Sequence, residues 1–118
     1  MTQHDVTSPV IPGGAQNITP QAFNEACHDM GIETYVLYGG DYTSFHTPEA
    51  RQNYLNQTLT MLKEGKYTGI DLDFEHPQTW GPEFVNMNAS FTQLLREQFS
   101  QFLREMSSAL HQQGGYRT

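Results

Sequence analysis

Three stretches of the chain carry apolar residues at the spacing of an amphipathic helix. Residues 19–31, 47–65 and 90–114 each begin at a hydroxyl side chain suited to a helix N-cap and end at a glycine. The first two open with Thr-Pro, because proline is favoured at the first helical position. In the third, Ser90 and Gln93 form a capping box. The expected buried faces are Phe23, Ala26, Cys27 and Met30; Tyr54, Leu55, Leu59 and Leu62; and Phe91, Leu94, Leu95, Phe99, Phe102, Leu103, Met106 and Leu110.

Between these helices lie two short stretches typical of strands. Residues 32–38 and 67–75 are rich in β-branched and aromatic side chains. Strands that alternate with helices of this length pair in parallel through helical crossovers, which predicts an α/β fold with the order helix, strand, helix, strand, helix. Two strands alone leave open edges, so the unit is expected to need neighbours or to self-associate through these edges. Residues 1–18 are polar and Pro/Gly-containing and are expected to form a loop or tail before a domain at 19–118.

The second strand alternates apolar residues with three carboxylates, Asp71, Asp73 and Glu75. A strand's period of two places all three on one face, with successive ones about 6.6 Å apart. Parallel strands are usually covered on both faces, so this face is expected to be partly enclosed. Mutual repulsion would then keep one carboxyl protonated to higher pH, as a general acid requires. The pattern therefore favours a functional site with a general acid over an acidic strand face that simply contacts water.

Metal binding by the same carboxylates is the competing hypothesis. Acidic pairs hold Mg²⁺ or Mn²⁺ through oxygen ligands, as in nucleotide-sugar transferases. His76 follows Glu75 directly and is expected to point to the opposite face, and the glycine of a calcium-binding loop is missing. The sequence therefore favours a site with no metal and no other cofactor.

Composition limits the partners and the setting. The 118 residues suffice for one small domain, and the net charge of −7 argues against a nucleic-acid partner. No apolar run approaches the roughly 20 residues that span a bilayer, and no signal-peptide pattern is visible. The single cysteine, Cys27, is expected to be a buried hydrophobe. Sequons at Asn17, Asn56 and Asn88 hint at a secretory route.

The carboxylate strand resembles a known family signature. Residues 68–75 match seven of the eight positions of the glycoside hydrolase family 18 motif, with Thr68 in place of its first Asp. Leu37-Tyr38-Gly39-Gly40 is similar to the double-glycine motif of an earlier strand, with Tyr38 at the usual serine. The flanking helices resemble the lysosomal di-N-acetylchitobiase branch through Pro48, Arg51, Tyr54, Leu55, Gln57, Leu59 and Lys63, and through Thr92, Leu94, Leu95, Arg96, Glu97, Phe102, Arg104 and Glu105.

This resemblance, over roughly residues 27–106, implies part of a (β/α)8 TIM barrel, since a closed barrel needs about 250 residues. It implies substrate-assisted, retaining hydrolysis of β-1,4-linked N-acetylglucosamine oligosaccharides such as chitobiose. Glu75 would protonate the glycosidic oxygen, Asp73 would orient the substrate's acetamido group, and Asp71 would share a proton with Asp73. It also implies a lysosomal or secreted protein.

Two aromatic residues are candidates to contact the sugar. Trp80 and Tyr42 follow the two strands and are expected at the mouth of the site, although Trp80 alternatively packs locally. The chain ends before the later-strand Tyr and aromatic floor of the family, so an incomplete pocket is expected. The alternative from another class is a non-catalytic, chitin-binding relative; family lectins commonly lose the terminal Glu, whereas Glu75 is retained.

Overall fold

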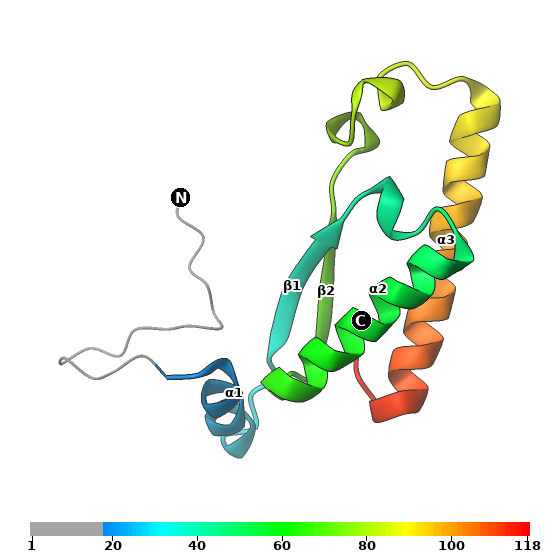
Figure 1. Cartoon of the computed structure of the whole chain (residues 1–118). Helices are drawn as coiled ribbons and strands as arrows, with labels where there is room; N and C mark the ends of the chain where they lie inside the picture. The colour runs from blue at the N-terminus through cyan, green and yellow to red at the C-terminus, as the bar shows by residue number, and fades with distance from the viewer. Residues whose placement is uncertain (1–17) are drawn as a thin grey trace.

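A computed structural model describes residues 18–118 and shows helices alternating with strands (Figure 1). The five main elements are α1 (Pro20–Asp29), β1 (Tyr35–Gly40), α2 (Pro48–Gly65), β2 (Gly69–Phe74) and α3 (Ala89–Gly114). Short 3₁₀ turns follow the strands: η1 (Tyr42–Ser44) after β1, and η2 (Pro77–Thr79) and η3 (Pro82–Phe84) after β2. The predicted α/β class and the predicted order of elements are confirmed. Residues 1–17 of the predicted tail, with the Asn17 sequon, lie outside the described residues.

The two strands form a parallel sheet whose register runs from Tyr35 beside Gly69 to Gly40 beside Phe74. The chain also returns to the other edge of β2 after α3. There Ile70 N–H donates to the Arg117 carbonyl at 2.9 Å, next to an isolated parallel bridge between Gly69 and Arg117. Two successive strand–helix–strand crossovers are therefore present. The first joins β1 to β2 through α2, and the second joins β2 to the segment at Arg117 through α3.

Both crossover helices, α2 and α3, lie on the same side of the sheet (Figure 1). They cover the face that carries Ile70, which is fully buried. Asp71 and Asp73, on the other face, are exposed. The expected enclosure of both faces is thus wrong for the described residues. The reason is that successive crossovers of the same hand, running in the same direction along a sheet, place their helices on one face.

The core between the sheet and the two helices is rich in aromatic rings. Phe45 has no exposed surface and lies at its centre. Its ring centroid is 5.1 Å from that of Phe99, 5.8 Å from Phe102 and 6.1 Å from Phe74. Such offset and edge-to-face contacts stabilise the core in addition to the burial of apolar area. The cluster therefore holds α3 against the C-terminal end of β2.

The predicted helix starts are confirmed at two of three positions. Thr19 and Thr47 cap α1 and α2, with hydroxyls accepting from backbone N–H groups three residues on, at 3.1 and 3.0 Å. The third prediction is wrong, because Asn88 rather than Ser90 caps α3 and accepts from Phe91 N–H at 2.8 Å. Asn is at least as good an N-cap as Ser, so the loop's path decides between them.

The predicted buried faces are correct mainly where the helices contact the core. Tyr54, Leu55 and Leu62 of α2 are buried, as are Leu95, Phe102, Met106 and Leu110 of α3, while Thr58 replaces the half-buried Leu59. Leu94 and Leu103 are exposed instead. In α1 the prediction holds for Cys27 but fails for Met30, which is 69% exposed.

The α1 face is polar because it packs on the end of α2 rather than on the core. Asn24 is 1% exposed, and its side-chain amide donates to the Gly65 carbonyl at 2.7 Å. The predicted end of α2 at Gly65 is confirmed, and the left-handed residue is the following Lys66, with φ of 57°. Within residues 18–118, no helix is both long and apolar enough to cross a membrane.

Candidate functional site

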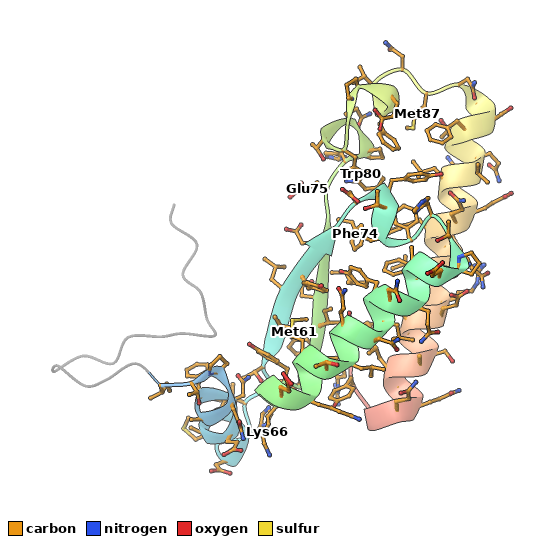
Figure 2. All side chains as sticks on the ribbon, in the orientation of Figure 1. Met61, Lys66, Phe74, Glu75, Trp80 and Met87 are labelled. Atoms are coloured by element: carbon orange, nitrogen blue, oxygen red, sulfur yellow. The ribbon has the colours of Figure 1, made fainter. Side chains whose placement is uncertain are left out.

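Strand β2 sets Asp71 and Asp73 in a row on its exposed face, and Glu75 continues directly after the strand (Figure 2). All three are exposed, and none forms a hydrogen bond or ion pair with another residue of the described part, 18–118. Their charges are therefore compensated by solvent on an open sheet face.

The double-glycine motif lies directly beside this row. Gly39 is in register with Asp73, and Gly40 with Phe74. A Cβ on Gly39 would stand 2.6 Å from the backbone oxygen of Asp73, closer than real Cβ contacts allow. Glycine at this position therefore permits the close approach of the two strands and leaves Asp73 uncovered from β1. The sequence showed the two motifs at a suitable separation along the chain, and the structure adds the register in which their strands pair.

Tyr54 of α2 holds this part of β1 from the opposite face. Its phenol donates to the Gly39 carbonyl at 3.0 Å, and Tyr54 is 6% exposed. Burial, and then the nearby Tyr38, raise the pKa of the Tyr54 phenol above its ordinary value. The hydroxyl therefore keeps its proton and remains a donor to Gly39.

The two departures from the family motifs lie away from the carboxylate row. Tyr38 is in register with Leu72 and faces the helices, with its ring centroid 5.0 Å from that of Tyr54. Thr68 precedes β2 at the end opposite Glu75, where its hydroxyl accepts from Thr34 N–H at 2.9 Å. Neither side chain is placed to perturb Asp73 or Glu75 directly.

Trp80 and Tyr42 lie in an aromatic cluster on the helix side rather than along the carboxylate row. The Trp80 ring is 5.8 Å from Phe45 and 5.6 Å from Phe84, in edge-to-face contacts. The Tyr42 ring is 5.4 Å from Phe84. Their positions match local packing, the alternative considered for Trp80 from sequence.

A cavity of about 250 Å³ connects the two groups of predicted residues, because Glu75 and Trp80 both line it. Its other walls include Phe74, Met87 and Arg96. Sequence reasoning missed this cavity, because only tertiary packing folds the loop after β2 and the first half of α3 over Phe74 and Phe45. The one sequence signal for the cavity was a tryptophan in the loop, Trp80, followed by the apolar residues at the start of α3.

No group of three or more His, Cys, Asp or Glu side chains within residues 18–118 is arranged to hold a metal ion. The spacing of Asp71 and Asp73, two residues apart on an extended strand, is consistent with this result.

No protein-family model matches this sequence, and no solved structure gives a significant match to this chain. A functional conclusion must therefore come from the motif residues and from the geometry described above.

Proposed function

We propose that the row of Asp71, Asp73 and Glu75 is the catalytic strand of a hydrolase of β-1,4-linked N-acetylglucosamine oligosaccharides, of the glycoside hydrolase family 18 type. The observation that carries this proposal is the pair Asp71 and Asp73 on the open face, with Asp73 in parallel register with Gly39 and with Glu75 directly after the strand. The match of residues 68–75 to the family motif supplies the substrate class. The fold supports it as well, because strands and helices alternate as in part of a (β/α)8 barrel.

The position of Glu75 suits the role of general acid. In barrels the chemistry lies at the C-terminal ends of strands, and Glu75 directly follows the last residue of β2. In the proposed reaction its carboxyl proton passes to the glycosidic oxygen as the bond from that oxygen to the anomeric carbon breaks. The acetamido oxygen of the substrate, oriented by Asp73, bonds to the same carbon. Water then replaces the acetamido oxygen and returns a proton to Glu75, while Asp71 shares a proton with Asp73.

The proposed site needs a cover, because a general acid requires a carboxyl whose pKa is raised by burial or by neighbouring charge. Two strand edges have backbone N–H and C=O groups with which additional strands can pair. They are the outer edge of β1 and the part of the β2 edge that follows the bridge to Arg117. We propose that self-association through these edges encloses the carboxylate face. A lysosomal or secreted setting follows from the family type, and Asn56 and Asn88 of two sequons are exposed.

The alternative function is sugar binding without hydrolysis. The exposure of Asp71, Asp73 and Glu75 favours it, since exposed carboxyl oxygens are free to accept hydrogen bonds from sugar hydroxyls.

The deciding experiment compares the purified chain with Glu75→Gln on chitobiose and on a fluorogenic chitobioside. Glu83→Gln serves as a matched control, because it removes an exposed carboxylate from the following loop. Release of N-acetylglucosamine by the wild type and the control, but not by Glu75→Gln, supports the hydrolase. Saturable chitobiose binding without release, weakened by Asp73→Asn, supports the binding alternative. Absence of both release and binding contradicts both functions.

A further inference from the structure

The sequon Asn88-Ala89-Ser90 lies where the loop after β2 enters α3 (Figure 1). All three residues are exposed, and Asn88 precedes the helix in an extended conformation, with φ of −76° and ψ of 171°. Helix ends fray more readily than helix interiors, so the first turn of α3 can open locally while the rest of the fold stays intact. An Asn-X-Ser sequence at such a surface junction is a candidate acceptor for an N-linked sugar.

Capping of α3 uses only one of the two polar atoms of the Asn88 amide. The Oδ1 atom accepts a hydrogen bond from Phe91 N–H at 2.8 Å. Within residues 18–118, the Nδ2 atom of Asn88 donates to no other residue. N-glycosylation joins the sugar to Nδ2 and leaves Oδ1 as a carbonyl acceptor, so a glycan on Asn88 is compatible with the cap of α3.

The sequon Asn56-Gln57-Thr58 is presented differently, because it lies inside α2. Asn56 is exposed, but Thr58 has no exposed surface, and its hydroxyl donates to the Tyr54 carbonyl at 2.8 Å. The sequon requires a hydroxyl at its third position, so a transferase must reach this group as well as the asparagine. Thr58 becomes accessible only when the middle of α2 unfolds, whereas Ser90 is already exposed.

We propose that Asn88 is an N-glycosylation site of the folded chain and that Asn56 is not. In the transfer, a bond forms between Nδ2 of Asn88 and the anomeric carbon of a sugar diphosphate donor. The bond from that carbon to the diphosphate oxygen breaks, and one proton leaves Nδ2. The site rests on the secreted or lysosomal setting proposed above for its donor in the cell, and it does not depend on hydrolysis at Glu75.

The test offers the folded full chain to a soluble N-glycosyltransferase that transfers glucose from UDP-glucose to Asn-X-Ser/Thr sequons. Every chain carries Asn17→Gln, so that the third sequon, which lies outside the described residues, does not contribute. Peptides of residues 50–62 and 82–94 measure the acceptance of each sequon without the fold, and mass spectrometry of proteolytic fragments locates the added hexose.

The rate at each site in the chain is divided by the rate in its peptide. We expect this ratio to be at least about 10-fold lower for Asn56 than for Asn88, because α2 must unfold locally to expose Thr58. Equal ratios at the two sites, or no modification of Asn88 in the chain, overturn the proposal. Neither measurement depends on chitobiose or on the location of the protein in a cell.

Three variants separate the acceptor from the helix cap. Ser90→Ala removes the sequon hydroxyl and Asn88→Asp removes the acceptor nitrogen, while both keep a capping oxygen at residue 88. Both should lose the added hexose without a lower midpoint of thermal unfolding. Asn88→Ala should lose the hexose and also unfold at a lower temperature, because the cap is gone. The glycosylated chain should unfold like the unmodified one; if it unfolds as early as Asn88→Ala, the sugar displaces the cap and the proposal fails.

Discussion

At the scale of single residues, Gly39 has a strict steric requirement beside the carboxylate row. A Cβ at this position meets the backbone of Asp73, which has no flexible end that can move aside. We expect Gly39→Ala to lower the free energy of unfolding by about 1–3 kcal/mol, because the strands must separate. Urea denaturation measures the loss.

Gly31→Ala is the matched control for this prediction. Gly31 has φ of 75°, but a Cβ added there would meet no atom within 4 Å. Only backbone strain of about 1 kcal/mol is therefore expected at Gly31. If Gly39→Ala costs no more than Gly31→Ala, close strand contact is not what the glycine provides.

Glu105 makes stability depend on pH through its two hydrogen-bond donors. Gln101, and then Arg51, lower the pKa of the Glu105 carboxyl, against an opposing effect of burial. A carboxyl whose folded pKa lies below its unfolded value stabilises the fold above the unfolded value, and the contribution is lost as pH falls. The Arg51 pair joins α2 to α3 at 3.0 Å, but the Glu105 side chain is 40% exposed, so the contribution is modest.

We therefore expect Glu105→Gln to be less stable than the wild type by about 0.5–1 kcal/mol at pH 7. The difference should shrink as the pH falls below the ordinary carboxyl pKa of about 4.5, and it is lost once the pH has also passed the lowered pKa of the folded state. Urea unfolding at pH 7, 5 and 3 measures this trend, with Glu97→Gln as a control for losing an exposed carboxylate on the same helix. A difference that stays constant with pH would show that Glu105 does not act through its charge.

At the scale of elements, α2 and α3 end in the same way. Each ends with a glycine, a residue in the left-handed conformation, and a tyrosine whose ring lies over the glycine, where a Cβ would collide with it. These residues are Gly65, Lys66 and Tyr67 in α2, and Gly114, Gly115 and Tyr116 in α3. Each tyrosine leads the chain into a segment parallel to the preceding strand, so the repeated helix end sets up the repeated crossover.

Lys66 is the non-glycine residue at this left-handed position, and it offers a stabilising substitution. Lys66→Gly removes a backbone strain of about 1 kcal/mol. It also breaks an exposed ion pair with Glu25 at 3.4 Å, worth less than about 0.5 kcal/mol. Thermal and urea unfolding should show a net gain of about 0.5 kcal/mol. Lys63→Gly, inside the helix, should lose about 1 kcal/mol, and the prediction fails if both changes destabilise.

Local patterns predicted the elements better than they predicted what the elements contact. The threonine caps of α1 and α2 and the row of Asp71, Asp73 and Glu75 depend on residues adjacent in sequence, so the pattern sufficed. The open carboxylate face and the buried Asn24 depend on which side the helices pack, which no local period encodes. The packing of Trp80 and Tyr42 against Phe45 and Phe84 is likewise a tertiary contact that the motif does not specify.

At the scale of the whole molecule, the described part of the chain is one-sided. One sheet face is sealed by aromatic rings and two helices, while the other presents Leu37 beside Asp71 in the strand register. Leu37 is 45% exposed, and Ile32, just before β1, is 49% exposed. An apolar side chain on an open face, next to an unpaired strand edge, is a typical site for a second chain to pair.

Leu37→Lys tests whether a second copy covers this face. The wild type should associate with increasing concentration in sedimentation velocity, and the substitution should raise the dissociation constant at least about 10-fold, because a buried, unpaired charge opposes pairing. The introduced lysine stands beside Asp71, so the fold of the single chain should be kept by a favourable cross-strand pair. Val85→Lys changes an exposed apolar residue in the loop after β2, 55% accessible against 45% for Leu37, and should leave association unchanged. A wild type that stays monomeric at all concentrations, or equal effects of both substitutions, would mean that the carboxylate face is not enclosed by self-association, and hydrolysis at Glu75 would then lack its required cover.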